Sequence, residues 1–582
     1  MNPSEMKKIV IYDFEVFRFD VLLGLLIVDG GKKRLFQTWD KEKMKDIYRR
    51  TKGTDWTWVG FNNTSYDDHI YEAILEGKDP YETSKAIIQE NWRRSRFDIR
   101  SFDVMRSTNK FVSLKVTELI RGERIDTSDV DFDLPRPLTE EEKKATERYN
   151  ESDLEATLYN FSMFYNKFAL KLDLIEEFGL DAKKALRATD AQLSAMVLGA
   201  KKIEGIESME VTRPEYRNLR LKNEPLLRFY ESEGWRSKVQ KTIRIGNAEL
   251  TVGSGGLHQA IPRCHYDKLL YCDVSGYYNL VMMNYNLLPR SVPPEGKARY
   301  RDMYRQQLEM KKSNPIKRAG YKTVLLAVFG AQLNEYSDFY DPQQGYLVTI
   351  TGQLFLCDLL EKLAPYVTIV QTNTDGVMLS LNNWDSERYI IGMIEDWERR
   401  TGFVIKKEKI YDLWQRDVNN YVYRAADGSI ECKGEALRNW KIDDEAYSKM
   451  TLFDATNPPI VARGVIEYLM NQKSPESVVE AMKGDLRYFQ YSCKKGAYDA
   501  LLLDGEEIRS PSRAFAAKKG SIEIQKAKDG RKARVPNLPS PLLVWNGNIQ
   551  DLDSERINYG YYVSRIKERI DEFVGPVQMT LW

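Results

Sequence analysis

Asp13 and Glu15 stand two positions apart at the end of the apolar run in IVIYDFEVF. Such a run is typical of a β-strand, and residues two apart on a strand face the same side of a sheet. Both carboxylates can therefore reach one divalent cation, because Mg²⁺ prefers oxygen ligands. This DxE pattern is weak by itself, since an isolated acidic residue is most often solvated.

Two further segments carry acids in a similar setting. Asn62 and Asp67 stand in the polar segment GFNNTSYDDHI, and Tyr149 and Asp153 lie four apart in ERYNESDLEATLYNF, where a helix would put them on one face. With the first pair they make four carboxylates and a tyrosine. This set suits two Mg²⁺ ions, with Tyr149 orienting the attacking water.

The second half of the chain contains another pair of carboxylates. Asp273 ends the apolar strand of LLYCDVSGYYNLVMM, and Asp375 stands at the predicted turn of a hairpin in VQTNTDGVML. Between them, Arg318, Lys322 and Phe329 share one face of a predicted helix, which can present two cations to a triphosphate. A solvated basic helix is the alternative for that face.

The elements that position the first acids are predicted to form an α/β unit. Strands are predicted at Ile9–Tyr12, at Val21–Val28 as its hairpin partner, and at Trp56–Phe61. A helix is predicted over Thr139–Phe168, and it opens with Thr139 and Glu142 at capping-box spacing.

A polar region around residues 200–250 precedes a second unit. Its predicted elements are a strand at Asp267–Tyr278, two helices in 297–332 broken at Ser313-Asn314-Pro315, and a β-hairpin at Tyr366–Leu381 with Asp375-Gly376 as its turn.

The chain has 582 residues, of which 42% are apolar and 30% charged, so it is neither wholly disordered nor fibrous. No apolar run approaches the ~18 residues of a membrane helix. The N-terminus lacks a signal-peptide core, so we expect a cytoplasmic protein without membrane contact. Five scattered cysteines form no CxxC pair and support neither a zinc site nor a disulfide framework.

Eighty-seven basic residues nearly balance 86 acidic ones, and the net charge of +1 argues against a chain that is a polyanion binder as a whole. Local basic clusters remain: seven Lys or Arg lie within Lys518–Arg534, and a second cluster comprises Arg93, Arg94, Arg96 and Arg100. A solvated surface is the more frequent meaning of such runs. The 12% aromatic content suits stacking on unpaired bases and equally suits large cores.

The first acids follow the order DxE, then Asn-x₃-[FY]-D, then Tyr-x₃-Asp, which resembles the three exonuclease motifs of proofreading DNA polymerases. The intervening SFDVMRSTNKFVSLKVTELIRG also resembles that family's segment between the second and third motifs. The resemblance implies an RNase H-like domain in which Asn62 contacts DNA and Tyr149 assists catalysis. The metal ligands it implies are Asp13, Glu15, Asp67 and Asp153.

The second set of acids resembles the motifs of family B DNA polymerases. DVSGYYN resembles motif A, DxxSLYP, with departures at positions 276, 277 and 279. The resemblance implies that Asp273 is a catalytic metal ligand and that the carbonyl of Val274 adds a second metal contact. It also implies that the ring of Tyr278 excludes a ribose 2′-hydroxyl.

RAGYKTVLLAVFGAQ resembles motif B, KxxxNSxYG, with Leu and Ala at positions 326 and 327 in place of Asn and Ser. The resemblance implies that Lys322 and Arg318, with Arg305 on the preceding helix, bind the nucleotide. It also implies that Phe329 and Gly330 lie against the DNA.

VQTNTDGVML resembles motif C, YxDTDS. Asp375 aligns with the second, metal-binding aspartate, while Asn373 stands where the first is expected. An amide is a neutral and weaker ligand than a carboxylate. Because Asp273 and Asp375 remain, we expect an active polymerase with two Mg²⁺ ions in each active site and Mn²⁺ as an alternative.

Two glycine-containing segments resemble DNA contacts of the family. IECKGEAL implies that Lys433 and Gly434 contact the primer-template backbone, and VGSGGLHQAI implies that Gly255 and Gly256 bind template. A glycine pair is otherwise more often a plain turn.

The resemblance spans residues 10–440 and indicates a compact, bacteriophage-type family B polymerase with a proofreading exonuclease. We expect an α/β (α+β) chain: an exonuclease domain at 1–185, a connecting region at 186–250, the palm at 251–295 and 332–440, the fingers at 296–331, and the thumb and tail at 441–582. The implied function is DNA-directed DNA synthesis with 3′→5′ proofreading in phage genome replication, in the bacterial host cytoplasm.

Asp273 and Lys322 are 49 residues apart, and Lys322 and Asp375 are 53 apart. These intervals are too short for the insertions of the protein-primed branch. We therefore expect a monomer that extends the 3′ end of primer-template DNA with dNTPs and uses no terminal protein. The tail Gln578–Trp582 resembles the Gln-x-x-Leu-Phe peptide that docks into sliding clamps, and packing of the tail on the thumb is the alternative.

Three other functions stay open. Asn373 and the departures in motifs A and B favour a nuclease whose second half only holds DNA. A non-catalytic replisome adaptor would use its clamp-binding tail. A reverse transcriptase is conceivable because the choice of template is not legible in the sequence.

Overall fold

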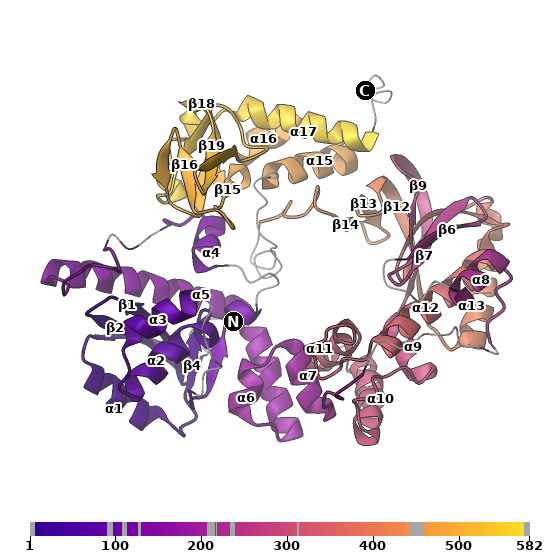
Figure 1. Cartoon of the computed structure of the whole chain (residues 1–582). Coiled ribbons are helices and arrows are strands. Elements are labelled where there is room, and N and C mark those ends of the chain that lie inside the picture. The colour runs from indigo at the N-terminus through magenta and orange to yellow at the C-terminus, as the bar shows by residue number, and fades with distance from the viewer. Residues whose placement is uncertain are drawn as a thin grey trace. The chain divides into compact units, whose positions relative to one another are not determined.

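The computed structural model describes residues 6–89, 97–107, 113–125, 128, 130–206, 216, 218–232, 239–310, 313–442 and 458–574. The fold is mixed α/β with sheets of five, nine, three and four strands among these residues (Figure 1). The chain divides into two units, each built from separate stretches of sequence. Unit 1 lies within 1–189, 441–460 and 479–562, and unit 2 lies within 190–440, 461–478 and 563–582.

The five-stranded sheet of unit 1 has the strand order β3-β2-β1-β4-β5. Strands β1, β2 and β3 are antiparallel neighbours, whereas β1, β4 and β5 run parallel. Their bounds are Ile9–Val16, Val21–Asp29, Lys32–Thr38, Thr57–Gly60 and Ser101–Asp103 for β1 to β5. The structure thus confirms the predicted hairpin and the predicted strand near Trp58.

Apolar residues cover both faces of this sheet. The even-numbered residues of β1, such as Tyr12 and Phe14, pack with α2 (Asp67–Leu75). The odd-numbered residues Ile9 and Ile11 pack with the long helix α5 (Glu140–Phe178). Asp13 and Glu15 continue this odd-numbered face, so the alternation of a strand directs both acids toward α5.

Helix α5 begins with the predicted capping box. Thr139 accepts a hydrogen bond from the backbone N–H of Glu142, and the Glu142 side chain accepts one from the N–H of Thr139. The helix extends beyond the predicted end at Phe168 and stops at Gly179, whose φ of +60° suits glycine. The remaining helices of this part are α1 (Lys41–Thr51), α3 (Pro80–Ile88), α4 (Leu114–Arg121) and α6 (Ala182–Arg187).

Residues 479–562 add two small sheets to unit 1, with the strand orders β15-β18-β21 and β17-β16-β19-β20. The first contains Tyr491–Cys493, Ser512–Ser521 and Leu542–Val544; the second contains Glu506–Ile508, Ala500–Leu503, Ile524–Lys528 and Arg531–Arg534. The basic segment Lys518–Arg534 therefore forms strands, and β20 is an exposed edge strand.

The nine-stranded sheet of unit 2 has the order β14-β13-β12-β9-β11-β10-β8-β7-β6, with antiparallel pairing throughout. The bounds from β6 to β14 are Gln240–Ile245, Ala248–Gly253, His258–Ala260, Cys264–Val274, Val367–Asn373, Gly376–Leu381, Ile405–Asp417, Asn420–Ala425 and Ile430–Lys433. The helices of this part are α7 (Asp190–Leu198), α8 (Glu224–Ser232), α9 (Tyr277–Asn284), α10 (Pro294–Glu309), α11 (Pro315–Ala331), α12 (Pro342–Leu363) and α13 (Glu387–Thr401). Each of three further helices contains a boundary between the two units: α15 (Pro459–Asn471), α16 (Pro475–Met482) and α17 (Tyr559–Val574).

The two helices predicted in 297–332 are confirmed as α10 and α11, with Asn314 capping the second. Two local predictions are wrong. The strand predicted to reach Tyr278 ends at Val274, because Gly276 at φ +62° starts α9. The hairpin turn consists of Thr374 and Asp375 rather than Asp375-Gly376, since Thr374 takes the left-handed conformation and Asn373 pairs with Gly376.

Candidate active sites

Three carboxylates from two distant segments meet in unit 1. Asp13 and Glu15 of β1 and Asp153 of α5 each place an oxygen within 4.8 Å of the others. Glu15 and Asp153 are buried, and Asp13 is partly buried. Within the described part of the chain, this is the one group of three or more His, Cys, Asp or Glu side chains so arranged.

The fourth predicted carboxylate, Asp67, lies beside this group at the start of α2. Its Oδ1 accepts a 3.0 Å hydrogen bond from the backbone N–H of Phe14, which stands between the two acids of β1. Its side chain is only 3% exposed. The four acids predicted from three separate motifs are therefore neighbours.

Burial and crowding raise the pKa values of these acids. Loss of hydration, and then the charge of Asp153, raise the pKa of Asp13 to about 7. Burial followed by the charge of Asp13 raises the pKa values of Glu15 and Asp67 well above the usual range. Such a set is stable in its charged form only with cations close by.

Two polar neighbours were not predicted from the sequence. Lys115 of α4 donates hydrogen bonds from Nζ to Asp153 Oδ1 and, at 3.1 Å, to Glu118 Oε1. Burial lowers the pKa of Lys115, but the charges of Asp153 and Glu118 outweigh it and raise the pKa. Asn150 of α5 donates from Nδ2 to Asp13 Oδ2 at 2.9 Å.

A glycine on the neighbouring strand leaves room for the Asn150 side chain. Gly24 lies opposite Asp13 on β2, and a Cβ there would stand 1.7 Å from Asn150 Oδ1. In the sequence, Asn150 could have been recognised as a site residue only from its position next to Tyr149. Lys115 stands in SFDVMRSTNKFVSLKVTELIRG, the segment that resembles the family between its second and third motifs, but that resemblance assigned the lysine no role.

The other predicted residues of unit 1 border the acidic group. The Tyr149 ring lies 4.7 Å from Lys115 Nζ, and burial followed by the charge of Asp153 raises the pKa of its hydroxyl. Asn62 adopts a left-handed conformation with φ of 65°, and its backbone N–H donates to Asp103 Oδ1 at 3.0 Å. Asp103, buried at the end of β5, thus shapes the loop that carries Asn62.

The acidic group fits divalent cations. Its donors are carboxylate oxygens, the type that Mg²⁺ and Mn²⁺ prefer. Burial, followed by repulsion between the acids, raises the pKa values of Asp13 and Glu15, and bound metal ions would favour their charged forms. Asp13, Glu15 and Asp153 would supply the central ligands, with Asp67 adjacent.

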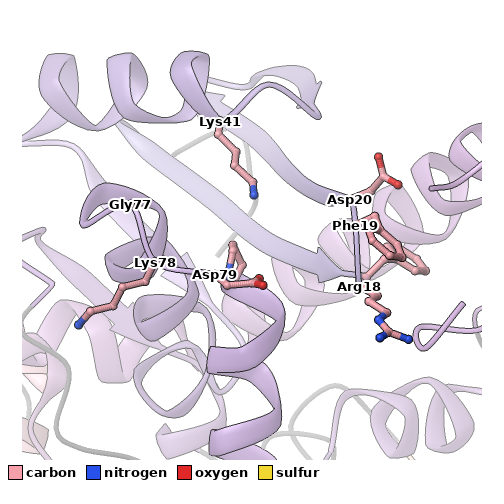
Figure 2. Close-up of a pocket in the computed structure, with 9 residues that line it drawn as sticks. Arg18, Phe19, Asp20, Lys41, Gly77, Lys78 and Asp79 are labelled. Carbon is pink, nitrogen blue, oxygen red and sulfur yellow. The ribbon is translucent and has the colours of Figure 1, made fainter. Parts of the chain in front are cut away.

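A separate cavity of about 350 Å³ lies at the turn between β1 and β2. Its lining residues are Phe17, Arg18, Phe19, Asp20, Lys41, Gly77, Lys78, Asp79 and Pro80. Figure 2 shows Lys41 extending toward the segment of Lys78 and Asp79. The lining mixes both signs of charge and includes none of the predicted site residues.

The second pair of predicted acids meets in the large sheet of unit 2. Asp273 on β9 lies opposite Gly376, the first residue of β11, and Asp375 immediately precedes that glycine. The N–H of Val274 donates to the carbonyl oxygen of Asp375 at 2.9 Å. The strand pairing thus places both carboxylates at the same end of two adjacent strands.

The electrostatics of this pair resemble those of the first group, with more exposure to solvent. Burial, followed by the charge of Asp273, raises the pKa of Asp375 to about 6, and Lys433 opposes the shift. Burial also raises the pKa of Asp273, with Lys406 of the neighbouring strand opposing it. Two carboxylates at the same end of adjacent strands, each influenced by a lysine, fit a metal and phosphate site less completely than the three acids of unit 1.

Asn373 has a structural partner. Its Nδ2 donates to the carbonyl oxygen of Val418 at 3.3 Å, and Gln371 donates to the same oxygen. The amide at the position expected for an aspartate therefore helps to tie β10 to the turn between β12 and β13.

The predicted nucleotide residues lie on α9, α10 and α11. Tyr278 stacks on Phe329 with ring centroids 4.0 Å apart. Lys322 is exposed on α11, one turn from Leu326, which is 55% exposed. Arg318 donates to the carbonyl oxygen of Gln307 at 3.2 Å.

The remaining predicted residues of unit 2 differ in their surroundings. Arg305 is exposed and pairs with Asp302 on its own helix. Gly330 is exposed, with open space around it. Gly255 lies in the exposed loop between β7 and β8, and a Cβ on Gly256 would meet Thr374 Oγ1 at 2.6 Å.

Lys433 is the last residue of β14, and Gly434 follows it. Lys433 is exposed, and its charge acts on Asp375. Gly434 has φ of 109°, and a Cβ there would stand 2.0 Å from the carbonyl oxygen of Asn419. This close approach requires glycine.

Some predictions fall outside the described residues. These are the clamp-like tail Gln578–Trp582 and the basic residues Arg93, Arg94 and Arg96. In the part of the chain that is described, no helix combines the length and the apolar character needed to cross a membrane.

No protein-family model matches the chain, and no curated protein matches it significantly. Among solved structures, it is similar to the family B DNA polymerase from the hyperthermophilic archaeon Pyrobaculum calidifontis, with a TM-score of 0.44 and 14% identity. The alignment covers 98% of this chain and 78% of that chain.

Proposed function

We propose that the protein is a DNA-directed DNA polymerase with a 3′→5′ exonuclease, the nuclease site lying in unit 1 and the polymerase site in unit 2. The main support is the meeting of acids predicted from separate motifs: Asp13 and Glu15 of β1 gather with Asp153 of α5. The second site, in a different unit, is supported by Asp273, which lies opposite Gly376 and whose charge acts on the neighbouring Asp375.

At the nuclease site, the reaction is hydrolysis of the terminal phosphodiester. The oxygen of a water molecule attacks phosphorus, the bond from phosphorus to the 3′ oxygen breaks, and a 5′-mononucleotide leaves. Two bound Mg²⁺ ions would neutralise charge and activate the attacking oxygen. In this scheme Tyr149 orients the water through its hydroxyl, Lys115 offsets negative charge on the phosphate, and Asn150 holds Asp13 in place.

At the polymerase site, the primer 3′-hydroxyl attacks the α-phosphorus of a dNTP, and the bond to the β-phosphate breaks to release pyrophosphate. Asp273 and Asp375, with the carbonyl oxygen of Val274, would hold two Mg²⁺ ions, and Mn²⁺ is an alternative. Lys322 and Arg318 bind the triphosphate, with Arg305 nearby. Tyr278, held against Phe329, limits the space for a ribose 2′-hydroxyl.

The DNA contacts in this proposal are Asn62 at the nuclease site and Gly255, Gly256, Phe329, Gly330, Lys433 and Gly434 at the polymerase site. Backbone contacts dominate such binding, so affinity for primer-template falls with salt and depends little on sequence. The domain division, the RNase H-like and right-hand architectures, a monomeric state, a clamp contact of the tail and a role in phage genome replication in a host cytoplasm belong to the same proposal.

One observation favours a second function, a 3′→5′ exonuclease with a weakened polymerase site. The Asn373 amide already donates to the carbonyl oxygen of Val418. It therefore serves the sheet, and the polymerase site has one carboxylate fewer than its motif resemblance implies.

Primer extension with Mg²⁺ and dNTPs separates the two functions. The polymerase proposal expects wild type to extend a DNA primer, Asp13→Ala to extend without degrading it, and Asp375→Ala only to degrade it. Degradation without extension by wild type, with Mn²⁺ as well, would leave the exonuclease as the function. Primer extension on an RNA template in place of the DNA template would identify a reverse transcriptase.

A further inference from the structure

Arg513, on β18, is completely buried. No ion pair joins it to a carboxylate among the described residues, and burial lowers the pKa of its guanidinium to about 10. A buried cation is costly unless its N–H groups are hydrogen-bonded. The position of those hydrogen bonds therefore indicates what this arginine does.

One of its hydrogen bonds goes to the last turn of α4, where the Leu119 carbonyl also accepts from the N–H of Gly122, and another goes to Glu123, two positions past the end of the helix. Nη2 donates to the carbonyl oxygens of Leu119, at 3.0 Å, and Glu123, at 2.8 Å. Nε donates to Gln490 Oε1 and Nη1 to the carbonyl oxygen of Gly547, each at 2.9 Å. The last carbonyls of a helix lack partners within the helix and carry partial negative charge, so a cation is favourable there.

Residues near Arg513 complete this cap. Gln490 Nε2 donates to the carbonyl oxygen of Ile120 at 3.0 Å. The backbone N–H of Ile549 donates to the carbonyl oxygen of Gly122 at 2.8 Å. Further along, the N–H groups of Arg124 and Ile125 donate to Asn548 Oδ1 and to the carbonyl oxygen of Asn546. Residues 490–549 thus hold one end of α4.

The other end of α4 carries Lys115, which donates to Asp153 of the acidic group. Between the two ends, Thr117 accepts a 2.9 Å hydrogen bond from Asn160 of α5. The helix has eight residues and a length of about 12 Å, and a helix this short moves as one body. A shift at its capped end therefore reaches the lysine.

We propose that Arg513 is a positioning residue for the nuclease site: by binding the carbonyl oxygens of Leu119 in α4 and of Glu123 just after it, Arg513 fixes this end of the helix and so sets Lys115 against Asp153. This inference rests on the proposed nuclease function. A displacement of about 1 Å at a reacting centre can cost on the order of 100-fold in rate. Arg513→Met should therefore lower the exonuclease kcat by 10- to 100-fold with little change in KM for single-stranded DNA.

The matched control is Tyr562→Phe. The Tyr562 hydroxyl is buried in the same part of unit 1, donates to the carbonyl oxygen of Phe489 and accepts from the N–H of Ala516, and neither of these partners belongs to α4. Its loss should change exonuclease kcat by less than threefold. Primer extension at the other site should be unchanged in both variants.

A double-mutant cycle tests whether Arg513 acts through Lys115. In a Lys115→Met background, Arg513→Met should cause little further loss of kcat. An equal fold-loss in the two backgrounds would mean general damage and would overturn the proposal.

Hydrogen exchange without added metal supplies a readout that needs no activity. Arg513→Met should speed amide exchange in residues 114–125 and leave α1 unchanged. If that occurs while wild type shows no nuclease activity, the function is wrong and the helix cap stands. Unchanged exchange would refute the cap itself.

If Arg513→Met fails to fold, Asn548→Ala replaces it. This change removes the side-chain acceptor for the backbone N–H of Arg124 and leaves the guanidinium of Arg513 in place. A smaller loss of kcat, with faster exchange in 114–125, supports the proposal. No change in either quantity contradicts it.

Discussion

The backbone N–H of Val274 donates a 2.9 Å hydrogen bond to the carbonyl oxygen of Asp375. This bond joins the end of β9 to the turn between β10 and β11, and so brings the carboxylate of Asp273 toward that of Asp375. Because the link is made by the backbone, substitutions of either side chain should leave the geometry of the turn intact. Side-chain variants at this site can then be read as tests of chemistry.

If unit 2 holds the proposed polymerase site, Asn373→Asp should not speed primer extension. The aspartate would lose the hydrogen bond to the carbonyl oxygen of Val418 and would place a negative charge against that oxygen. We expect extension at least threefold slower and a free energy of unfolding lower by about 1–2 kcal/mol. Asn373→Ala, which removes the donor without adding charge, is the control. Faster extension by Asn373→Asp would mean that position 373 is a weakened metal ligand.

Lys115→Met should disable the exonuclease and spare synthesis. The lysine is the nearest described cation to Asp153, so its removal leaves the phosphate charge less compensated. We expect the single-turnover rate of mononucleotide release to fall by about 100-fold. Lys115→Arg keeps the charge and should lose less. A parallel loss in primer extension would show that the variant is generally damaged.

The stability of the metal-free protein should depend on the charge of Asp13. Its pKa is about 7 in the folded protein, against 3.8 as the ordinary value. The folded state therefore binds the proton more tightly, and the stability that this provides below pH 4 is lost as pH rises through 7. Asp13→Asn removes this loss.

The comparison is made by thermal unfolding in chelator. The Tm of Asp13→Asn relative to wild type should rise between pH 4 and pH 7, by ~2 °C or more, and level off above. Added Mn²⁺ should stabilise wild type at pH 8 and close the gap. A difference that stays constant with pH would contradict the raised pKa.

Among the glycines predicted to contact DNA, substitution by alanine should destabilise the protein much more at Gly434 than at Gly330. Gly434→Ala forces a Cβ to within 2.0 Å of the carbonyl oxygen of Asn419 at a φ of 109°, so we expect a loss of about 2–4 kcal/mol in unfolding free energy. Gly330→Ala meets open space on α11 and should change stability by no more than about 1 kcal/mol.

Binding of primer-template at two salt concentrations completes this comparison. Gly330→Ala should weaken binding without loss of Tm if the helix surface lies against DNA. Unchanged binding would remove Gly330 from the interface. An unchanged Tm for Gly434→Ala would show that the tight approach to Asn419 is relieved at no cost.

Local signals predicted much of the fold. The capping box of Thr139 and Glu142 marked the start of α5, and alternation on β1 predicted that Asp13 and Glu15 share a face. These signals depend on neighbours in sequence. The hairpin turn was misplaced by one residue because the left-handed conformation fell on Thr374, a residue type that seldom adopts it.

The motif order predicted the long-range meeting of the acids, but other long-range contacts left no comparable signal. Lys115 stood in a segment that resembled the family and was given no role there, and its contact with Asp153 is seen only when α4 packs on α5. Arg513 stands among other basic residues of the C-terminal part, yet it is buried and they are mainly exposed. Composition cannot separate the two cases, because burial is a property of the assembled unit.

Unit 1 is built from stretches that lie far apart in the sequence, and this has a consequence for the newly made protein. The carbonyl oxygen of Glu123 finds Arg513 390 positions later. At a synthesis rate of about 5–20 residues per second, the ribosome needs on the order of 20 to 80 seconds to supply that partner. Until then the nascent chain has its acidic strand but lacks the cap on α4. Under the proposed function, chains truncated before Arg513 would carry the acids of the nuclease site without the cap on α4, so the site is complete only after Arg513 has been translated.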